Sequence, residues 1–302
     1  MAATLRCRGF GVSAWCAVAT CVVALTCDAA SDSTPPPHIR VPLSTDGSDP
    51  RKWDRSLDGT VAAPGNHKVI HEDDEIRVLS VTVPAGTEEH LHLHPYYSVL
   101  VFDSLARSVD RDASGKPIAE RAMVDGIAST RGPVPWVFVQ PPQALHSIKN
   151  IDTVAGHLIR IEFKQGTVPE LVHPRWPDGQ MPVSLDGTDP RKWNRQRDGV
   201  IAAGDIHKVI FENERIRVQS VTVAPMSVEP YHLHPYPSVL VMDRIPSSVV
   251  DRDRTGKPLL APSLPKGPVV VLQPPQPLHS VQNLGSRPLH LTRIEFKNGF
   301  PP

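Results

Sequence analysis

The chain contains two copies of one sequence unit, and this duplication limits the choice of fold more than any other feature. Residues 46–84 and 186–224 align without a gap, and 24 of their 39 positions are identical. Three later segments of the first copy also recur in the second, at 91–101, 140–150 and 157–164. Side chains retained in both copies have resisted change twice, so the repeat indicates which residues the fold or the function needs.

Length and composition favour two β-rich domains. A chain of 302 residues has room for two domains. Its 33 prolines suit a turn-rich β protein better than a helical one. The 32 basic residues equal the 32 acidic ones and form no basic run, so nucleic acid is not an expected partner.

The repeat boundaries and the composition divide the chain into five parts. We expect a signal peptide over 1–29 and a Pro-rich linker over 30–40. The first domain then covers 41–165, a Pro/Gly-rich connector covers 166–182, and the second domain covers 183–300.

All four cysteines lie within the first 27 residues. Arg6 and Arg8 precede a stretch without charge that ends at Asp28. This pattern is typical of a secretory signal peptide, and it predicts a secreted or periplasmic protein. A membrane anchor or a lipid-modified Cys27 is the alternative. Cleavage would leave no cysteine for a disulfide or a thiolate metal ligand.

Short alternating segments predict an all-β fold. Apolar and polar residues alternate over 76–83, and similar short segments cover 98–102, 135–139 and 157–163. The Asp-Arg-Asp sequence that leads to Gly at 110–115 is typical of a hairpin turn. Amphipathic helical periodicity is nearly absent, so a sandwich or barrel is expected.

Three histidines per copy form a candidate metal site. His92 and His94 are two residues apart in an expected strand, so they face the same side. His146 follows a Pro-Pro turn and is the expected third ligand. The second copy repeats this set as His232, His234 and His279. Imidazole suits Fe, Cu, Ni and Zn, and three protein ligands with open positions describe a catalytic metal site.

The two histidine segments resemble the two motifs of the cupin superfamily. Residues 86–94 resemble the first motif, a glycine, five residues and then His-x-His. Residues 141–150 resemble the second motif, Pro-x-Gly-x-x-His-x-x-x-Asn. Because both units match, the chain looks like a bicupin. The resemblance implies two tandem jelly-roll barrels, each with a metal inside its mouth.

Three departures from the cupin pattern are visible, and the first of them narrows the expected chemistry. The family's glutamate, four residues after the second histidine, is replaced by Ser98 and Ser238, and its motif glycine by Gln143 and Gln276. The second copy also lacks the leading glycine of the first motif and has Ala224, Pro225 and Met226 there. The remaining neutral three-His site resembles the thiol dioxygenase variety of cupins, which binds ferrous iron. We therefore expect a divalent metal, Fe(II) first, with Zn, Ni, Cu or Mn as alternatives. Manganese chemistry of the oxalate decarboxylase type is less expected, since it uses that glutamate.

Other polar residues kept in both copies suggest roles in the reaction. Tyr96 and Tyr236 share strand parity with the histidines if the strand continues regularly past the intervening proline, so they are expected as catalytic proton carriers. Four further side chains are expected to bind substrate: Ser98, Gln140, Ser238 and Gln273.

Further retained residues receive structural interpretations. His67 and His207, like His157 and His290, neighbour apolar strand residues and are expected in the core or at a sheet edge. The pairs Arg160/Glu162 and Arg293/Glu295 are expected to face solvent, opposite an apolar strand face. Trp53 and Trp193 are expected to anchor a segment that crosses over the barrel.

The favoured function is a secreted metal-binding bicupin that acts on a small molecule, an oxidoreductase of dioxygenase type. Open positions on a three-His metal accept both substrate and oxygen. Two alternatives stay open: a metal-dependent isomerase, dehydratase or cyclase, and a non-enzymatic ligand-binding protein with vestigial sites. Homo-oligomer formation or intramolecular pairing of the two cupin domains is the expected assembly.

Overall fold

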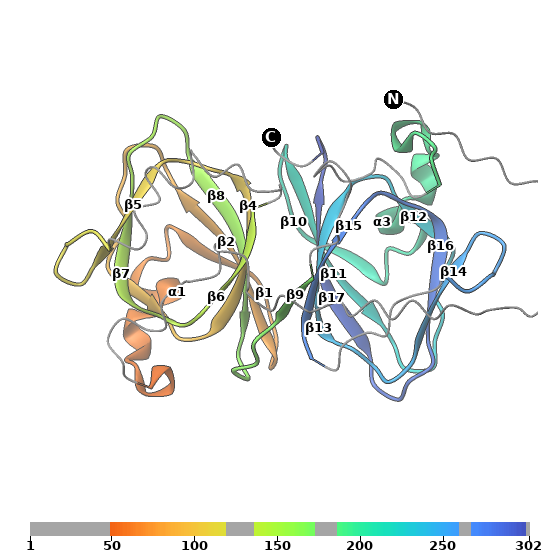
Figure 1. Ribbon diagram of the computed structural model, residues 1–302, viewed down its shortest axis with the longest axis horizontal. Helices are drawn as coiled ribbons and strands as arrows, with labels where there is room; N and C mark the ends of the chain where they lie inside the picture. Colours follow the sequence, from red (N-terminus) through yellow and green to blue (C-terminus); the bar gives the residue numbers. More distant parts are fainter. Residues whose placement is uncertain (1–48, 119–135, 173–185, 260–266, 300–302) are drawn as a thin grey trace, which may run out of the picture. The chain divides into compact units, whose positions relative to one another are not determined.

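Each copy of the repeat forms a larger and a smaller β-sheet (Figure 1). The computed structural model describes residues 49–118, 136–172, 186–259 and 267–299. The expected signal peptide, the linker and the later part of the connector lie outside these residues. Within them, no helix is long and apolar enough to span a membrane.

The first copy has a five-stranded sheet and a three-stranded sheet. In spatial order the larger sheet contains β1 (His67–Glu72), β2 (Ile76–Val83), β8 (Gly156–Phe163), β4 (Tyr97–Ser104) and β6 (Val137–Gln140). The smaller sheet contains β3 (His92–His94), β7 (Gln143–Asn150) and β5 (Ser108–Asp112). A hydrogen bond from His94 Nδ1 to Glu162 Oε1 joins β3 to β8, so the two sheets face each other.

The second copy repeats this arrangement with one added strand. Its larger sheet contains β10 (His207–Glu212), β11 (Ile216–Val223), β17 (Leu289–Phe296), β13 (Ser238–Arg244), β15 (Val269–Gln273) and β9 (Glu170–Val172). Its smaller sheet contains β12 (His232–His234), β16 (Gln276–Asn283) and β14 (Val249–Asp253). Strand β9 comes from the expected connector and pairs in parallel with β15.

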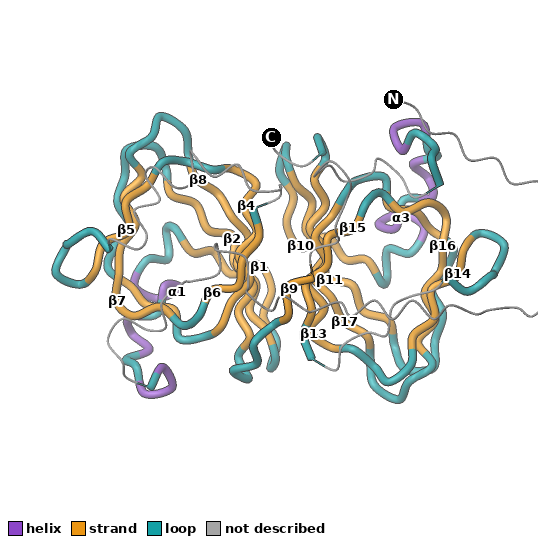
Figure 2. Tube along the Cα trace, in the orientation of Figure 1, coloured by secondary structure: helices purple, strands orange, loops and turns teal. Residues whose placement is uncertain are grey.

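Within the described ranges, helical structure is confined to short segments before the first strand of each copy (Figure 2). In the first copy these are two 3-10 turns, Pro50–Lys52 and Arg55–Leu57, and α1 (Gly59–Ala62). The second copy has Pro190–Lys192, Arg195–Arg197 and α3 (Gly199–Ala202). Asp and Asn side chains cap all six, because they accept hydrogen bonds from otherwise unpaired backbone N–H groups.

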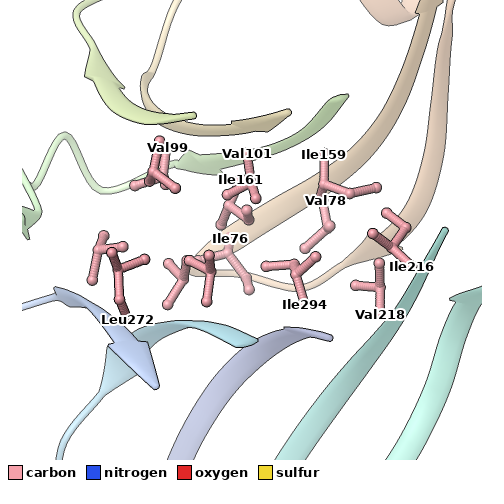
Figure 3. Close-up of a cluster of buried hydrophobic side chains, with 14 of the residues drawn as sticks. Ile76, Val78, Val99, Val101, Ile159, Ile161, Ile216, Val218, Leu272 and Ile294 are labelled. Carbon is pink, nitrogen blue, oxygen red and sulfur yellow. The ribbon is translucent and has the colours of Figure 1, made fainter. Parts of the chain in front are cut away.

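Both faces of the larger sheets are covered. Alternate residues of β2, β4 and β8, such as Ile76, Val99 and Ile161, pack in one hydrophobic cluster with residues of the second copy, such as Ile216 and Ile294 (Figure 3). The opposite faces of the same strands carry Arg77, Arg160 and Glu162, which are also buried. The apolar side chains therefore lie between the two copies, and the polar ones point inside each copy.

The expected all-β class and the expected strands are confirmed. Strand β2 has the bounds 76–83 that the alternation predicted, and β4, β6 and β8 cover the other three segments within a few residues. Gly115 closes the predicted hairpin turn with φ +79°, a conformation that glycine adopts without strain. Among the described residues the sheets face each other as in a jelly roll, and their ladders do not join into one closed barrel.

Candidate metal centre

Four imidazole rings gather between the two sheets of the first copy. The ring centroid of His92 lies 4.5 Å from that of His67, 5.0 Å from that of His94 and 4.5 Å from that of His146. All four side chains are buried. One ligand atom from each of His67, His92 and His94 can be chosen so that all three lie within 4.8 Å of one another.

The second copy contains the matching cluster. His207, His232 and His234 again offer three nitrogen atoms within 4.8 Å of one another, and the ring of His279 lies 4.6 Å from that of His232. Two copies with different flanking sequences thus produce the same constellation of four buried histidines.

Hydrogen bonds at Nδ1 fix which nitrogen faces the cluster. His232 Nδ1 donates to the carbonyl oxygen of Pro230 at 2.8 Å, and His234 Nδ1 donates to Glu295 Oε1 at 3.0 Å. In a neutral ring the proton on Nδ1 leaves a lone pair on Nε2. The two Nε2 atoms lie 3.2 Å apart, so two lone pairs face each other. This arrangement requires a cation or a proton between them.

The same donors organise the first copy. His92 Nδ1 donates to the carbonyl oxygen of His90 at 2.7 Å, and His94 Nδ1 donates to Glu162 Oε1 at 3.0 Å. His92 Nε2 is buried and has no hydrogen-bond partner. An imidazole whose far nitrogen is held by a carbonyl or carboxylate is the usual form of a metal-ligating histidine.

Burial keeps these rings neutral. It lowers the pKa of His92 and of His232 to about 4, and the pKa of His94 and of His234 lies well below 6.5 for the same reason. Ligands must be deprotonated before they bind a metal, so at neutral pH protons compete little for these nitrogens.

The buried charges around the first cluster leave a net negative balance when all are ionised. Four carboxylates and two guanidinium groups are buried there: Asp58, Glu89, Asp110, Glu162, Arg77 and Arg160. The excess of two negative charges matches one divalent cation. The residues present therefore fit a divalent metal in charge, in donor type and in the unpaired buried nitrogen.

Gly59, the first residue of α1, lies close to the histidine rings of the first copy. A Cβ atom built on Gly59 would lie 2.9 Å from His94 Cε1 and 3.1 Å from His92 Cδ2. Gly199 has the same relation to His234 and His232. These two positions therefore favour glycine, because a larger residue would displace a histidine ring. Trp53 and Trp193, which were expected to anchor a crossing segment, are half-buried, and that role stays a prediction.

The structure brings the predicted ligands together and adds one that the sequence interpretation had placed elsewhere. His92, His94 and His146 share the cluster, but His146 Nε2 lies 3.3 Å from the Gln143 amide nitrogen. His67 belongs to the tightest group, although its apolar neighbours suggested a core or sheet-edge position. Its retention in both copies was the one sequence signal for a role in the site. His146 and His279 as third ligands stay a prediction.

The predicted catalytic tyrosines are half-buried beside arginines. Tyr96 follows a break in the strand at Pro95, so the parity argument does not hold past His94. The guanidinium carbons of Arg55 and Arg77 lie 5.1 and 5.6 Å from its ring centroid. In the second copy Tyr236 is half-buried and has the same relation to its arginines. Proton transfer by either tyrosine stays a prediction.

The predicted substrate-binding residues lie on neighbouring strands of the larger sheets. Ser98 is cross-strand partner to both Gln140 and Glu162, and Ser238 is partner to both Gln273 and Glu295. Gln140 Nε2 donates to the carbonyl oxygen of Pro141 at 3.3 Å, which closes the turn. Ser238 Oγ accepts a hydrogen bond from Arg293 Nη1 at 2.9 Å. Contact of these four side chains with substrate stays a prediction.

The solvent-facing assignment of Arg160 and Glu162 was wrong. Both are buried, and Glu162 joins Arg77 Nε at 2.6 Å to His94 Nδ1. The alternation along the strand was correct, but its apolar face packs against the other copy and its charged face points to the histidines. Arg293 and Glu295 repeat this arrangement, so each glutamate positions a candidate ligand.

Comparisons with known proteins find weak similarity to several solved structures. No protein-family model and no curated protein matches the chain. Among solved structures, a cupin domain of Bordetella pertussis has 24% identity and a TM-score of 0.27, and covers 30% of this chain and 92% of its own. A cupin 2 conserved barrel domain protein of Leptotrichia buccalis has 9% identity and a TM-score of 0.24, with 76% and 88% covered. An oxalate decarboxylase of Bacillus subtilis has 12% identity and a TM-score of 0.23, with 78% and 73% covered.

The fold and site describe an all-β protein with two buried histidine clusters suited to a divalent metal. The solved structures named above share at most 24% identity with this chain, with TM-scores of at most 0.27. Their low similarity leaves activity, substrate and metal identity to the chemistry of the two clusters themselves.

Proposed function

We propose that the chain is a secreted, metal-dependent oxidoreductase of dioxygenase type that acts on a small molecule. The main support for metal binding comes from the second copy, where the Nε2 lone pairs of His232 and His234 face each other at 3.2 Å. A bound cation is the simplest way to remove their repulsion. Secretion is supported by the Arg-flanked apolar stretch near the N-terminus.

The donor set supports this class of chemistry. A divalent metal held by three imidazoles keeps open positions, where it supplies Lewis-acid and redox chemistry to bound molecules. The chain's own contribution is orientation: Glu162 and Glu295 hold one ring of each cluster, and backbone carbonyls hold another. The histidine rings are buried, and Gly59 or Gly199 lies against them. Electrostatic interactions are stronger in such a buried site than in water.

Elemental analysis and metal titration of the purified full chain test the proposal first. We expect up to two divalent ions per chain, and loss of both in the double variant His94→Ala/His234→Ala. His90→Ala is the matched control, because this exposed side chain lies outside the cluster while its carbonyl still accepts from His92. Full metal content in the double variant would refute metal binding at the clusters.

Oxygen consumption separates the dioxygenase from its alternatives. The iron-loaded protein is mixed with candidate thiols and other small acids, and dissolved oxygen is followed with an electrode. We expect consumption that disappears in the double variant. Turnover without oxygen consumption would instead support an isomerase, dehydratase or cyclase. Metal binding without any turnover would favour the ligand-binding alternative.

A further inference from the structure

A buried glutamate lies beside the histidine cluster in each copy. Glu89 and Glu229 are both 4% exposed. Glu89 Oε2 lies 4.0 Å from His92 Nε2, and Glu89 Oε1 lies 4.0 Å from His67 Nδ1. In the second copy Glu229 Oε2 lies 3.6 Å from His232 Nε2. Glu229 Oε1 lies 3.7 Å from His207 Nε2, the other ring nitrogen of this histidine.

The glutamate is the one residue of its segment that both copies keep. Residues 87–91 read Thr-Glu-Glu-His-Leu, and residues 227–231 read Ser-Val-Glu-Pro-Tyr. The backbone holds it in the same place both times, since Glu89 N donates to the Ile148 carbonyl and Glu229 N donates to the Val281 carbonyl. Retention amid otherwise changed neighbours indicates that the carboxylate itself is needed.

Both carboxylate oxygens of Glu89 are buried without a hydrogen-bond partner. An ionised carboxylate in that condition is strongly unfavourable unless a cation lies close to it. Burial accordingly raises the pKa of Glu89 to about 8 in the metal-free protein. The charge of Arg160 opposes this rise only in part. Among the described residues Glu89 forms no ion pair with a lysine or arginine, whereas Glu162 pairs with two arginines.

The distances suit a shared ion. Two ligands that each lie about 2.1 Å from one metal are roughly 3.0 Å apart when adjacent and roughly 4.2 Å apart when opposite. The four distances from the glutamates to the histidine nitrogens, 3.6 to 4.0 Å, fall between these limits.

We propose that Glu89 and Glu229 are metal ligands, which supply the carboxylate that Ser98 and Ser238 cannot. The inference rests on the proposed metal binding and adds one oxygen donor to each set of imidazoles. A carboxylate also admits harder ions such as Mn(II), and an octahedral ion would still keep positions open for substrate.

The test compares Glu89→Gln with Glu88→Gln in a full chain whose second site is disabled by His232→Ala/His234→Ala. Glu88 is the adjacent, exposed residue and interacts with Ser147 and Arg111 instead of the cluster. Co(II) is titrated by calorimetry, and its visible spectrum reports the donor set. We expect Glu89→Gln to weaken Co(II) binding roughly tenfold or more and to change the spectrum, while Glu88→Gln changes neither.

Thermal unfolding of the same variants distinguishes a ligand from a structural residue. As a ligand, Glu89 is an unpaired buried acid in the metal-free protein, so Glu89→Gln should leave its Tm equal or higher and lower only the gain in Tm upon Co(II) addition. Unchanged Co(II) affinity in Glu89→Gln would overturn the inference and leave the proposed metal site standing. Absence of Co(II) binding before any change at Glu89, in the intact chain, would overturn both.

Discussion

The two copies differ at one residue that orients a candidate ligand. In the second copy His207 Nδ1 donates to Gln219 Oε1 at 3.1 Å, and its Nε2 lies toward Glu229. In the first copy the equivalent position is Leu79, and His67 Nδ1 lies 3.3 Å from the Ala63 carbonyl oxygen. A side-chain amide thus holds the ring in the second copy, and a longer bond to a backbone carbonyl holds it in the first. This difference should make the second site the tighter one.

Exchange of these two residues tests the difference. We expect Gln219→Leu to weaken metal binding at the second site about 10- to 100-fold, because His207 loses the partner that fixes its ring. Leu79→Gln should strengthen binding at the first site, at a modest stability cost for a buried amide. Titration with Zn(II) in chains that keep one site each measures both effects. Equal Zn(II) affinities in the two single-site chains and in their two variants would contradict a role of residue 79 or 219 in orienting the ligand.

The histidine pairs were predictable from residue types and spacing, and the role of the glutamates was not. His92 and His94 face one side because strand side chains alternate. Glu89 lies 3 residues before His92, which it approaches. Glu162 lies 68 residues after His94, to which it is hydrogen-bonded, and no spacing rule connects these two residues. Only the register of β8 against β4 and the facing of the two sheets bring that pair together.

At the scale of elements, the short helix α1 lies over the histidine cluster of the first copy. Asp58 caps it, pairs with Arg77 Nη2 at 2.9 Å and forms a β-bridge with Leu93, between the two histidines of β3. These contacts hold Gly59 against the rings. The sequence did not predict this helix, because four residues have too little periodicity to be recognised.

Gly59→Ala tests the contact between α1 and the histidine rings. The added methyl group would lie 2.9 Å from His94 Cε1, so the ring or the helix must move, at a stability cost of about 1–3 kcal/mol. We expect metal affinity at the first site to fall as His94 is displaced. The matched control is Gly65→Ala, where an added Cβ would meet nothing within 4 Å. If Gly59→Ala bound metal like the control, α1 would not constrain the site.

At the scale of the whole molecule, one hydrophobic cluster belongs to both copies. Of the residues that the structure describes, 16 buried side chains from the larger sheets of the two repeats belong to it. Contacts between charged residues accompany it, such as Arg215 Nε to Asp103 Oδ2 at 3.0 Å and Arg244 Nη2 to Asp73 Oδ2 at 2.6 Å. Burial of branched side chains contributes about 1.5–3 kcal/mol each, so the two copies should stabilise each other.

Ile161→Ala tests this coupling. Ile161 is fully buried in the shared cluster, so its truncation should cost about 2–5 kcal/mol of unfolding free energy. Val69→Ala, at a position that is 41% exposed, should change stability by no more than about 0.5 kcal/mol. Calorimetry should show one cooperative transition that shifts in Ile161→Ala. Two separate transitions, with one unmoved, would show that the copies unfold independently.

By itself the sequence determined the all-β class, the duplication, the bounds of the main strands and the histidine pairs, because alternation and turn residues are local properties of the chain. The tertiary structure decided which face of each sheet lies inside. The apolar face is buried between the copies, so the charged face surrounds the histidines, and Glu162 and Arg160 became part of the site. The alternation along a strand predicts that its two faces differ, but only tertiary packing determines which residues contact each face.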